Sequence, residues 1–277
     1  MNDIDAHVHV WSDDIMRYPL LPGAPTAHMD LPRFNGEDVL DMTRLHGIER
    51  AVLVQSSFYG DDHRLLTDTI ASNPTMFRGI AALGESTPGI IHRMCELASR
   101  GVRGFRIIQL NPVNPRWLDT PGCEAMFRCA ADEGLLICPL IDPGALLTLA
   151  AMCRRFPNAG VVIDHMARIG AGGVIRAEDV ASLATMAEFP NVFVKVSGFW
   201  ALGRAKPPYD DLVPLIRRLR DAFGAERLMW ASDGPYGMTR GSYADAVSLV
   251  RERLDYLSDA ERAMILGGTA ERVFFPE

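Results

Sequence analysis

His7 and His9 stand one residue apart in the apolar run IDAHVHVW, residues 4–11. Side chains at positions i and i+2 of a strand point to the same face. A strand here would therefore project both imidazoles together, with Asp5 below them and Trp11 above. Paired imidazoles can bind a divalent metal or transfer protons. Two hydrogen-bonded structural histidines are the alternative, and this motif alone leaves the choice open.

Two further polar side chains end apolar runs of the same kind. His165 lies at the end of VVIDH, and Asp233 lies at the end of RLMWASD. Three neutral imidazoles and a carboxylate are a suitable ligand set for Zn²⁺ or Mn²⁺. The same groups could hold and deprotonate a water without metal, with Asp233 as general base. One catalytic site, with one divalent metal or none, is predicted on His7, His9, His165 and Asp233.

Eight short apolar runs must position these residues. Most are rich in Val, Ile and Leu without polar alternation, as expected of strands covered on both faces. They span residues 4–11, 50–57, 77–83, 102–108, 135–141, 161–167, 192–199 and 227–233. Amphipathic stretches separate these runs and also follow the eighth one. The last amphipathic stretch begins with the capping-box pair Ser258 and Glu261.

Repeated strand–helix units of this number predict an α/β protein, a (β/α)₈ TIM barrel in one domain over residues 1–277. An open doubly wound sheet would need a Gly-rich turn after the first strand, and WSDDIMRYPLLPG is not one. Long loops follow the predicted strands, and the connections that precede them are shorter. The polar strand ends should therefore meet at the C-terminal mouth of the barrel, where barrel active sites lie.

Several residues at this mouth are candidates for binding a substrate. Arg106 ends the fourth strand, where it could hold a substrate carboxylate bidentately or form an ion pair with Asp5 or another internal acid. Both interpretations stay open. Lys195, flanked by valines, is expected to pair with a buried carboxylate and to be structural. The other binding candidates are Gln55, Trp11, Trp200, Tyr236 and Arg168, and Arg204 is a further carboxylate candidate on a mouth loop. His28, on the Pro-rich first loop, could reach the site, but an exposed loop histidine is the simpler interpretation.

Composition narrows the class of partner. The 277 residues carry a net charge of −7 without a basic run, which argues against binding nucleic acid. No stretch of about 20 apolar residues could span a bilayer. The chain has no signal-like start, and its five cysteines form no C-x-x-C pair, so a cytoplasmic protein with free thiols is expected. A small-molecule substrate is the expected partner, and a homo-oligomer stays open.

The sequence resembles the amidohydrolase superfamily, in its amidohydrolase 2 branch of TIM-barrel lactonases, hydrolases and decarboxylases. The matching segments are DAHVHVW at 5–11, AVLVQ at 51–55, GVRGFR at 101–106, VIDHMAR at 162–168, VFVKVSG at 192–198, WASDGPYG at 230–237 and ILGGTAERVF at 265–274. Within the branch it is most similar to 2-pyrone-4,6-dicarboxylate lactonases and sugar-acid lactonases. The resemblance implies that His7 and His9 form the first-strand pair, and that Asp233 activates water.

Departures from the binuclear members of that superfamily bear on the metal. Those members carry a carboxylated lysine or a glutamate on the fourth strand and a histidine on the fifth. Here Arg106 ends the fourth strand, and the fifth, LLICPLI, has no histidine. The resemblance therefore implies at most one metal, and lactonases of this branch can work with none.

The function expected from these residues is hydrolysis of a small carboxylated lactone, with Asp233 as the base for water attack on the carbonyl. One alternative is metal-dependent, non-oxidative decarboxylation of an aromatic or unsaturated acid. The other is a barrel that binds carboxylates without catalysis.

Overall fold

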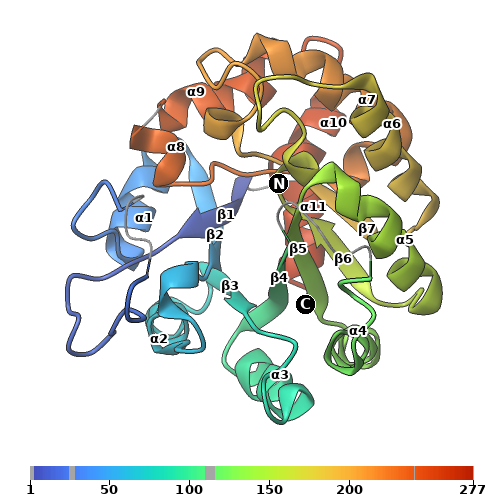
Figure 1. Ribbon diagram of the computed structural model, residues 1–277. Helices are drawn as coiled ribbons and strands as arrows, with labels where there is room; N and C mark the ends of the chain where they lie inside the picture. The colour runs from blue at the N-terminus through green and yellow to red at the C-terminus, as the bar shows by residue number, and fades with distance from the viewer. Residues whose placement is uncertain (1–2, 25–28, 110–115, 240, 277) are drawn as a thin grey trace.

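A computed structural model describes residues 3–24, 29–109, 116–239 and 241–276, and the candidate His28 lies outside these ranges. Eight parallel strands form one sheet in chain order (Figure 1). They are β1 (Asp3–His9), β2 (Ile48–Val54), β3 (Phe77–Ala82), β4 (Val102–Gln109), β5 (Leu136–Ile141), β6 (Gly160–Ile163), β7 (Val192–Val196) and β8 (Leu228–Trp230). The predicted (β/α)₈ barrel is confirmed.

The barrel closes between β1 and the segment that follows β8. Val8 forms a parallel bridge with Gly234. The His9 amide donates to the Gly234 carbonyl at 2.7 Å, and the Asp233 amide donates to the His7 carbonyl at 3.0 Å. The same backbone bonds that close the barrel thus set the two histidines beside Asp233.

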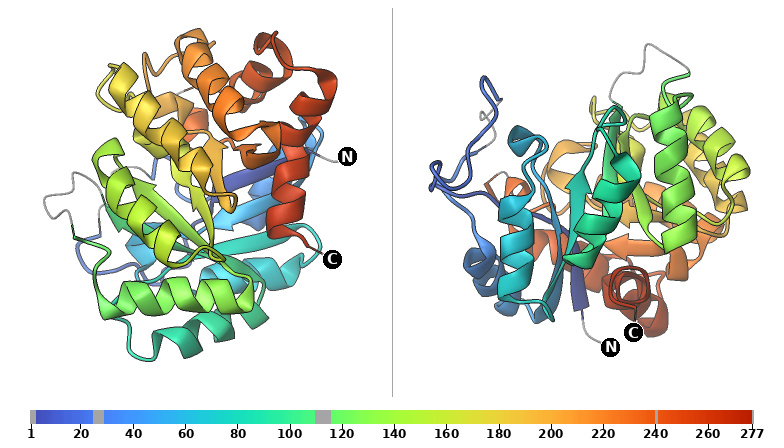
Figure 2. Two further views of the ribbon diagram at one scale, coloured as in Figure 1. Left: turned by 90° about the vertical axis from the view of Figure 1, so that its right-hand side faces the viewer. Right: turned by 90° about the horizontal axis from the view of Figure 1, so that it is seen from below.

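Helices cover the outside of the sheet, as Figures 1 and 2 show. They are α1 (Gly36–Arg44), α2 (Arg64–Ser72), α3 (Ile90–Ser99), α4 (Pro121–Glu133), α5 (Leu146–Arg155), α6 (Ala177–Thr185), α7 (Val213–Phe223), α8 (Tyr236–Thr239), α9 (Tyr243–Ser248), α10 (Asp259–Ala263) and α11 (Thr269–Phe274). The capping box predicted before α10 is present, because the Glu261 amide donates to Ser258 Oγ at 3.3 Å and the Ser258 amide donates to Glu261 Oε2 at 2.9 Å.

The apolar core has two parts. The larger lies between the strands and the helices, and a smaller one fills the barrel interior below the mouth. Ile4, Ala6 and Ile80 belong to the interior part, together with Phe274 of α11. In Figure 2 this red C-terminal helix lies against the end of the barrel at which β1 starts. It therefore seals the end opposite the mouth.

A β-bulge in β1 corrects one expectation. Asp5, His7 and His9 do not share a face, because the pairing of β1 with β2 shifts register between Asp5 and Val8. Ile4 and Ala6 fill the interior, so Asp5 faces the helices, where it accepts a hydrogen bond from Tyr243 at 2.9 Å. After the register shift, the residues that face the interior are the odd-numbered ones, so both histidines point inward. An inserted residue that re-aims a strand beside a functional site is a typical use of a bulge.

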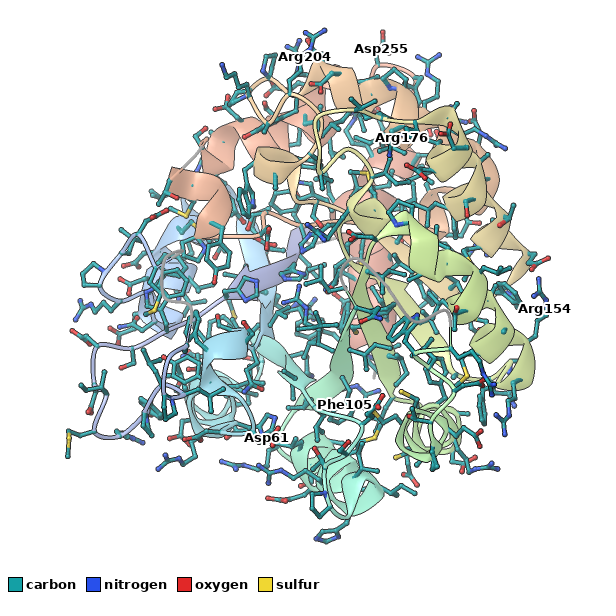
Figure 3. The ribbon with its side chains drawn as sticks, viewed as in Figure 1. Asp61, Phe105, Arg154, Arg176, Arg204 and Asp255 are labelled. Atoms are coloured by element: carbon teal, nitrogen blue, oxygen red, sulfur yellow. The ribbon has the colours of Figure 1, made fainter. Side chains whose placement is uncertain are left out.

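Many charged side chains lie at the periphery of the described structure. Figure 3 places the labelled side chains of Arg154, Arg204 and Asp255 at the outer edge of the molecule. Arg204, the further carboxylate candidate, is exposed there, away from the barrel centre. Within the described ranges, no helix combines the length and the apolar character needed to cross a bilayer.

Candidate active site at the mouth of the barrel

The predicted catalytic residues meet where the strands end. His9 is the last residue of β1, His165 follows β6 and Asp233 follows β8, while His7 lies two residues before His9 in the same strand. All four side chains are buried, His7 completely. The C-terminal mouth of the barrel is therefore the candidate site, as the loop lengths predicted.

Asp233 Oδ1 is the centre of this cluster. The Nε2 atoms of three imidazoles surround it, at 3.5 Å for His9, 3.6 Å for His7 and 3.8 Å for His165. His7 Nε2 and His9 Nε2 are 3.1 Å apart. The other carboxylate oxygen, Oδ2, accepts a hydrogen bond of 2.7 Å from Trp200 Nε1. Trp200 thus fixes the carboxylate so that Oδ1 stays directed at the imidazoles.

Two of the rings are oriented by hydrogen bonds at their far nitrogens. His9 Nδ1 lies 2.8 Å from the Val54 carbonyl oxygen, which can only accept, so this nitrogen carries the proton and Nε2 presents a lone pair to the cluster. His165 Nδ1 lies 2.8 Å from Ser197 Oγ. Such partners set the tautomer and the ring direction of catalytic and metal-binding histidines.

The donor set fits a divalent metal. His7, His9 and Asp233 each offer one buried ligand atom, and these atoms lie within 4.8 Å of one another. Ligands of a tetrahedral zinc at about 2.0–2.1 Å are about 3.3 Å apart, close to the 3.1, 3.5 and 3.6 Å observed between these atoms. A second group, His7 with Asp164 and His165, shares His7 with the first. The arrangement therefore suits a single ion.

A strained turn presents His165 to the mouth. Residues His165, Met166, Ala167 and Arg168 all have φ between 50° and 54°, the left-handed helical region. None is glycine, and this conformation costs roughly 1–2 kcal/mol per residue. One left-handed turn places His165 and Arg168, three residues apart, on the same side, and both line the pocket. Strain of this kind concentrates at functional sites.

The electrostatics of the cluster keep Asp233 ionised and disfavour the charged forms of His7 and His165. Burial raises the pKa of Asp233, but the imidazoles of His165, His9 and His7 outweigh it and hold that pKa well below its ordinary value. Burial lowers the pKa of His7, and the nearby Lys195 ammonium lowers it further. Burial also lowers the pKa of His165. Neutral imidazoles around a carboxylate can ligate a metal or take part in proton transfer near pH 7.

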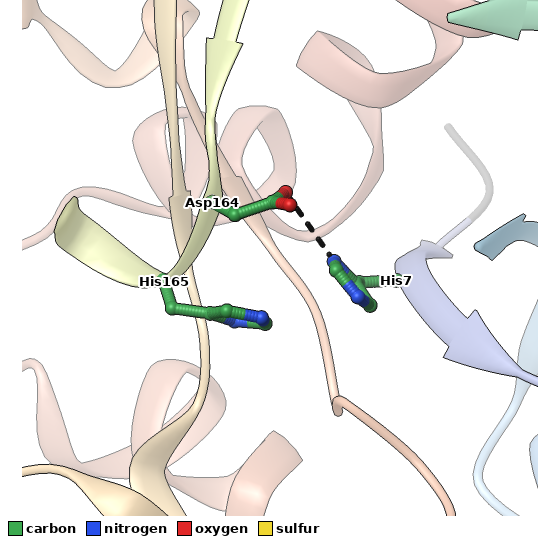
Figure 4. Close-up of side chains that lie close together, drawn as sticks. All are labelled: His7, Asp164 and His165. Carbon is green, nitrogen blue, oxygen red and sulfur yellow. Dashed lines mark ion pairs between the residues drawn. The ribbon is translucent and has the colours of Figure 1, made fainter. Parts of the chain in front are cut away.

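A buried charge network supports this cluster from below. Asp164, completely buried, lies 3.1 Å from Lys195 Nζ through Oδ1 and accepts a 3.1 Å hydrogen bond from Arg106 Nε through Oδ2. His7 Nδ1 lies 3.4 Å from Asp164 Oδ1 (Figure 4) and 3.2 Å from Lys195 Nζ. Burial raises the pKa of Asp164, but Lys195, His7 and Arg106 hold it well below its usual range.

The network also shows what Lys195 and Arg106 contact. Lys195 pairs with a buried carboxylate, as expected of it. Arg106 pairs with an internal acid, which is Asp164 rather than Asp5, and it lines the mouth pocket as well. An internal ion pair and a role in substrate binding are thus compatible for Arg106, because its Nε donates to Asp164 while the residue also forms part of the pocket wall.

A pocket of about 310 Å³ opens above the cluster, near the lower end of the range for small-molecule sites. Four predicted binding residues, Arg106, Arg168, Trp200 and Tyr236, are in its wall together with His9, His165 and Asp233. Arg168 Nη1 also donates to Asp142 Oδ1 at 2.6 Å. The described lining is completed by Ser56, Ser57, Leu140, Gly198, Ala201 and Leu202.

Besides Arg204, two predicted binding residues are not among the described residues that line this pocket. The Gln55 amide is occupied by backbone, donating to the carbonyls of Gly60 and Asp62 and accepting from the Ala82 amide. Trp11 is buried behind Tyr236, with their ring centres 5.6 Å apart. Both residues support the mouth without facing the pocket.

Asp164 and Ser197 support the site and were not predicted to do so from the sequence. Asp164 precedes His165 in an apolar strand, and a buried Lys195 requires an acid, so its presence could have been inferred. Ser197 follows β7 two residues after Lys195 and reaches His165 across 32 residues of sequence. A single hydroxyl near a strand end carries no such signal.

Comparisons with known proteins identify the family of the chain. A family model described as Amidohydrolase matches residues 4–275. The L-fucono-1,5-lactonase of Burkholderia ambifaria is 30% identical, over 96% of this chain and 93% of its own length. The 2-pyrone-4,6-dicarboxylate hydrolase of Comamonas testosteroni is 29% identical, over 99% of this chain and 90% of its own length.

A crystal structure of an amidohydrolase from Burkholderia multivorans with bound zinc superimposes with a TM-score of 0.84, covering 99% of both chains at 22% identity. At that identity the likeness concerns the fold, and it agrees with the closed barrel. The match of the family model over nearly the whole chain carries more weight, and the chain belongs to the amidohydrolase family.

Proposed function

We propose that this protein hydrolyses a small carboxylated lactone by attack of water on the ring carbonyl. The observation that carries the proposal is the set of three imidazole nitrogens within 3.8 Å of one buried carboxylate oxygen, under a pocket lined by two arginines. The relatives named as a lactonase and as a pyrone dicarboxylate hydrolase support it. Both names describe ring-shaped substrates, and the second describes one with two carboxylates.

In the proposed reaction, a water held against Asp233 Oδ1 attacks the lactone carbonyl and gives its proton to that carboxylate. The new C–O bond forms a tetrahedral oxyanion. Collapse of this oxyanion breaks the bond to the ring oxygen, which takes the proton back from Asp233 and leaves as a hydroxyl. The product is an open-chain hydroxy acid, and the carboxylate is restored for the next cycle.

His165 is the best-placed side chain to stabilise the oxyanion. It lines the pocket, and Ser197 lies 2.8 Å from its Nδ1. If the serine donates its hydroxyl hydrogen, the ring proton lies on Nε2, on the side of the pocket and of Asp233. A donor fixed in advance where negative charge develops contributes strongly to catalysis.

The ligands of a single divalent ion would be His7, His9 and Asp233, with His165 beside them. When bound, such an ion would acidify a water and polarise a carbonyl. This matters because the low pKa of Asp233 makes it a weak base toward ordinary water. Its ionised form, fixed by Trp200, remains the proton acceptor in either case.

Arg106 and Arg168 would hold the substrate carboxylate, since a guanidinium binds a carboxylate bidentately. A pH-indicator screen of carboxylated lactones tests the proposal. Stoichiometric release of acid at a rate proportional to enzyme concentration is expected for at least one lactone. Release of carbon dioxide from aromatic acids, with no lactone opened, would contradict it and indicate decarboxylation.

A further inference from the structure

We infer that the mouth pocket selects a planar, unsaturated lactone ring that carries carboxylate groups, rather than a polyhydroxylated sugar-acid lactone. The inference rests on the proposed function, and it chooses between two substrate classes that relatives of comparable identity are named for. Three features of the described lining carry it: apolar walls, few hydroxyl partners and two guanidiniums.

The walls of the pocket are mainly apolar and aromatic. Leu140, Ala201 and Leu202 supply aliphatic surface, and Trp200 and Tyr236 supply rings whose centres lie 6.0 Å apart at an interplanar angle of 39°. The Tyr236 ring also meets the His9 ring edgewise at 5.0 Å. Aromatic and aliphatic walls favour a flat apolar ring, which buries its faces without losing hydrogen bonds to water.

Partners for sugar hydroxyls are scarce among the described lining residues. Outside the catalytic cluster and the arginines, the neutral hydrogen-bonding side chains of these residues are Ser56, Ser57, Trp200 and Tyr236. Ser56 is buried and already interacts with Tyr236 and His9, and the Trp200 N–H is donated to Asp233. A hydroxyl that enters without a partner loses its hydration, at a cost of about tenfold or more in affinity.

The guanidiniums favour anionic substituents. Arg106 uses Nε for Asp164, and Arg168 uses Nη1 for Asp142. A guanidinium has five N–H donors in one plane, so neither of these bonds exhausts its arginine. Carboxylates attached to a conjugated ring lie close to the ring plane and present fixed pairs of oxygens. Two such arginines beside apolar walls match a flat ring with carboxylates at its edge.

The test compares kcat/KM for 2-pyrone-4,6-dicarboxylate and for L-fucono-1,5-lactone under the same conditions. We expect a preference of about 100-fold or more for the planar dicarboxylate, because the described lining offers few partners for the hydroxyls of the sugar lactone and two guanidiniums for the carboxylates. Leu140→Asn adds an amide to the wall and should narrow this ratio about tenfold, whereas the control Leu140→Ala, which adds no partner, should not raise turnover of the sugar lactone. Urea unfolding shows whether both variants are folded.

The outcomes separate this inference from the function on which it rests. Equal or faster hydrolysis of the sugar lactone would overturn the inference and leave lactone hydrolysis standing. Failure of a folded protein to hydrolyse these two compounds or any lactone of the carboxylated-lactone screen would overturn both. Equilibrium binding gives a second readout: isophthalate, a planar dicarboxylate, should compete with the substrate at least tenfold better than quinate, a polyhydroxylated ring acid. Tighter binding of quinate would also contradict the inference.

Discussion

Lys195 Nζ and Asp164 Oδ1 lie 3.1 Å apart, and neither side chain has any exposed surface. Both charges have left water completely, so each depends on the other. The same carboxylate also accepts from Arg106 and approaches His7. The buried carboxylate of Asp164 therefore contacts three residues: Lys195 inside the barrel, Arg106 in the wall of the pocket and the candidate metal ligand His7.

Removing that acid should be costly. Asp164→Asn leaves Lys195 and Arg106 without their counter-ion in the interior, and we expect the free energy of unfolding to fall by about 3–5 kcal/mol. Lys195→Met should cost less, because Asp164 keeps Arg106 and the new side chain can pack on Phe274, whose ring centre lies 5.7 Å from Nζ. Urea denaturation measures both changes.

The matched control is the exposed pair of Arg154 and Glu188, whose closest atoms are 2.6 Å apart. Because both side chains are more than half exposed, Glu188→Gln should change stability by at most about 1 kcal/mol. If Asp164→Asn lowered the free energy of unfolding by no more than Glu188→Gln does, the buried network would not be required for stability.

Asp5 predicts a pH dependence of stability. Burial raises the pKa of Asp5 to about 6, despite hydrogen bonds from Ser232, His7 and Tyr243, whereas the unfolded chain has a value near 3.9. Below about pH 4 the carboxyl is protonated in both states. Above about pH 6 it is ionised in both, and the folded state bears the full cost of the buried charge, about 3 kcal/mol. Stability from this group is therefore lost as pH rises from 4 to 6.

Asp5→Asn should remove that loss, since an amide has nearly the same shape and can keep the bonds to the Ser232 amide and to Tyr243. Unfolding free energies at pH 5 and 7.5 measure it: the variant should be more stable than wild type at pH 7.5 and differ less at pH 5. Asp255→Asn, at a carboxylate that is 86% exposed, is the control. An equal effect of both substitutions at the two pH values would refute the assignment.

Arg168 should act on substrate affinity. It lines the pocket from the strained turn that also carries His165. Arg168→Gln removes charge-assisted hydrogen bonds to the substrate carboxylate, and we expect KM to rise about 10–100-fold with a smaller change in kcat. Arg204→Gln, on the exposed periphery, should leave KM unchanged. A normal KM in Arg168→Gln would remove Arg168 from the proposed binding site.

Metal binding can be measured without turnover. We expect purified protein equilibrated with zinc to retain about one ion per chain by elemental analysis, and zinc to raise the melting temperature, because an ion that binds only the folded state stabilises it. His9→Asn should lose both effects, and His92→Asn, at an exposed position in α3, should keep them. Unaltered zinc content in His9→Asn would rule out the proposed ligand set.

Much of the fold and of the cluster could be predicted because local sequence encodes them. Apolar runs indicated the eight strands, and the parallel barrel then required their polar ends to share one mouth. The bulge in β1 could not be predicted, because strict alternation is the default for a strand, and the shift arises from pairing with β2. Because of this bulge, the Asp5 side chain faces the helices, whereas His7 and His9 face the interior of the barrel as predicted.

The side chains that only support the site were harder to predict. Gln55 ends its strand as a binding residue would, but its amide is used by the backbone of the following loop and of β3. In the sequence Asp164 is only the residue before His165, whereas in the structure it forms ion pairs with two buried cations, Arg106 and Lys195. Such roles depend on contacts between strands far apart in sequence, which spacing does not reveal.

The central claim is that Asp233 accepts the proton of the attacking water, and Asp233→Asn tests it most directly. The asparagine can still accept from Trp200 but cannot take a proton, so kcat for lactone opening should fall at least about 10³-fold while the circular dichroism spectrum and urea midpoint stay near those of wild type. A folded Asp233→Asn enzyme that keeps more than about a tenth of wild-type kcat would contradict the mechanism.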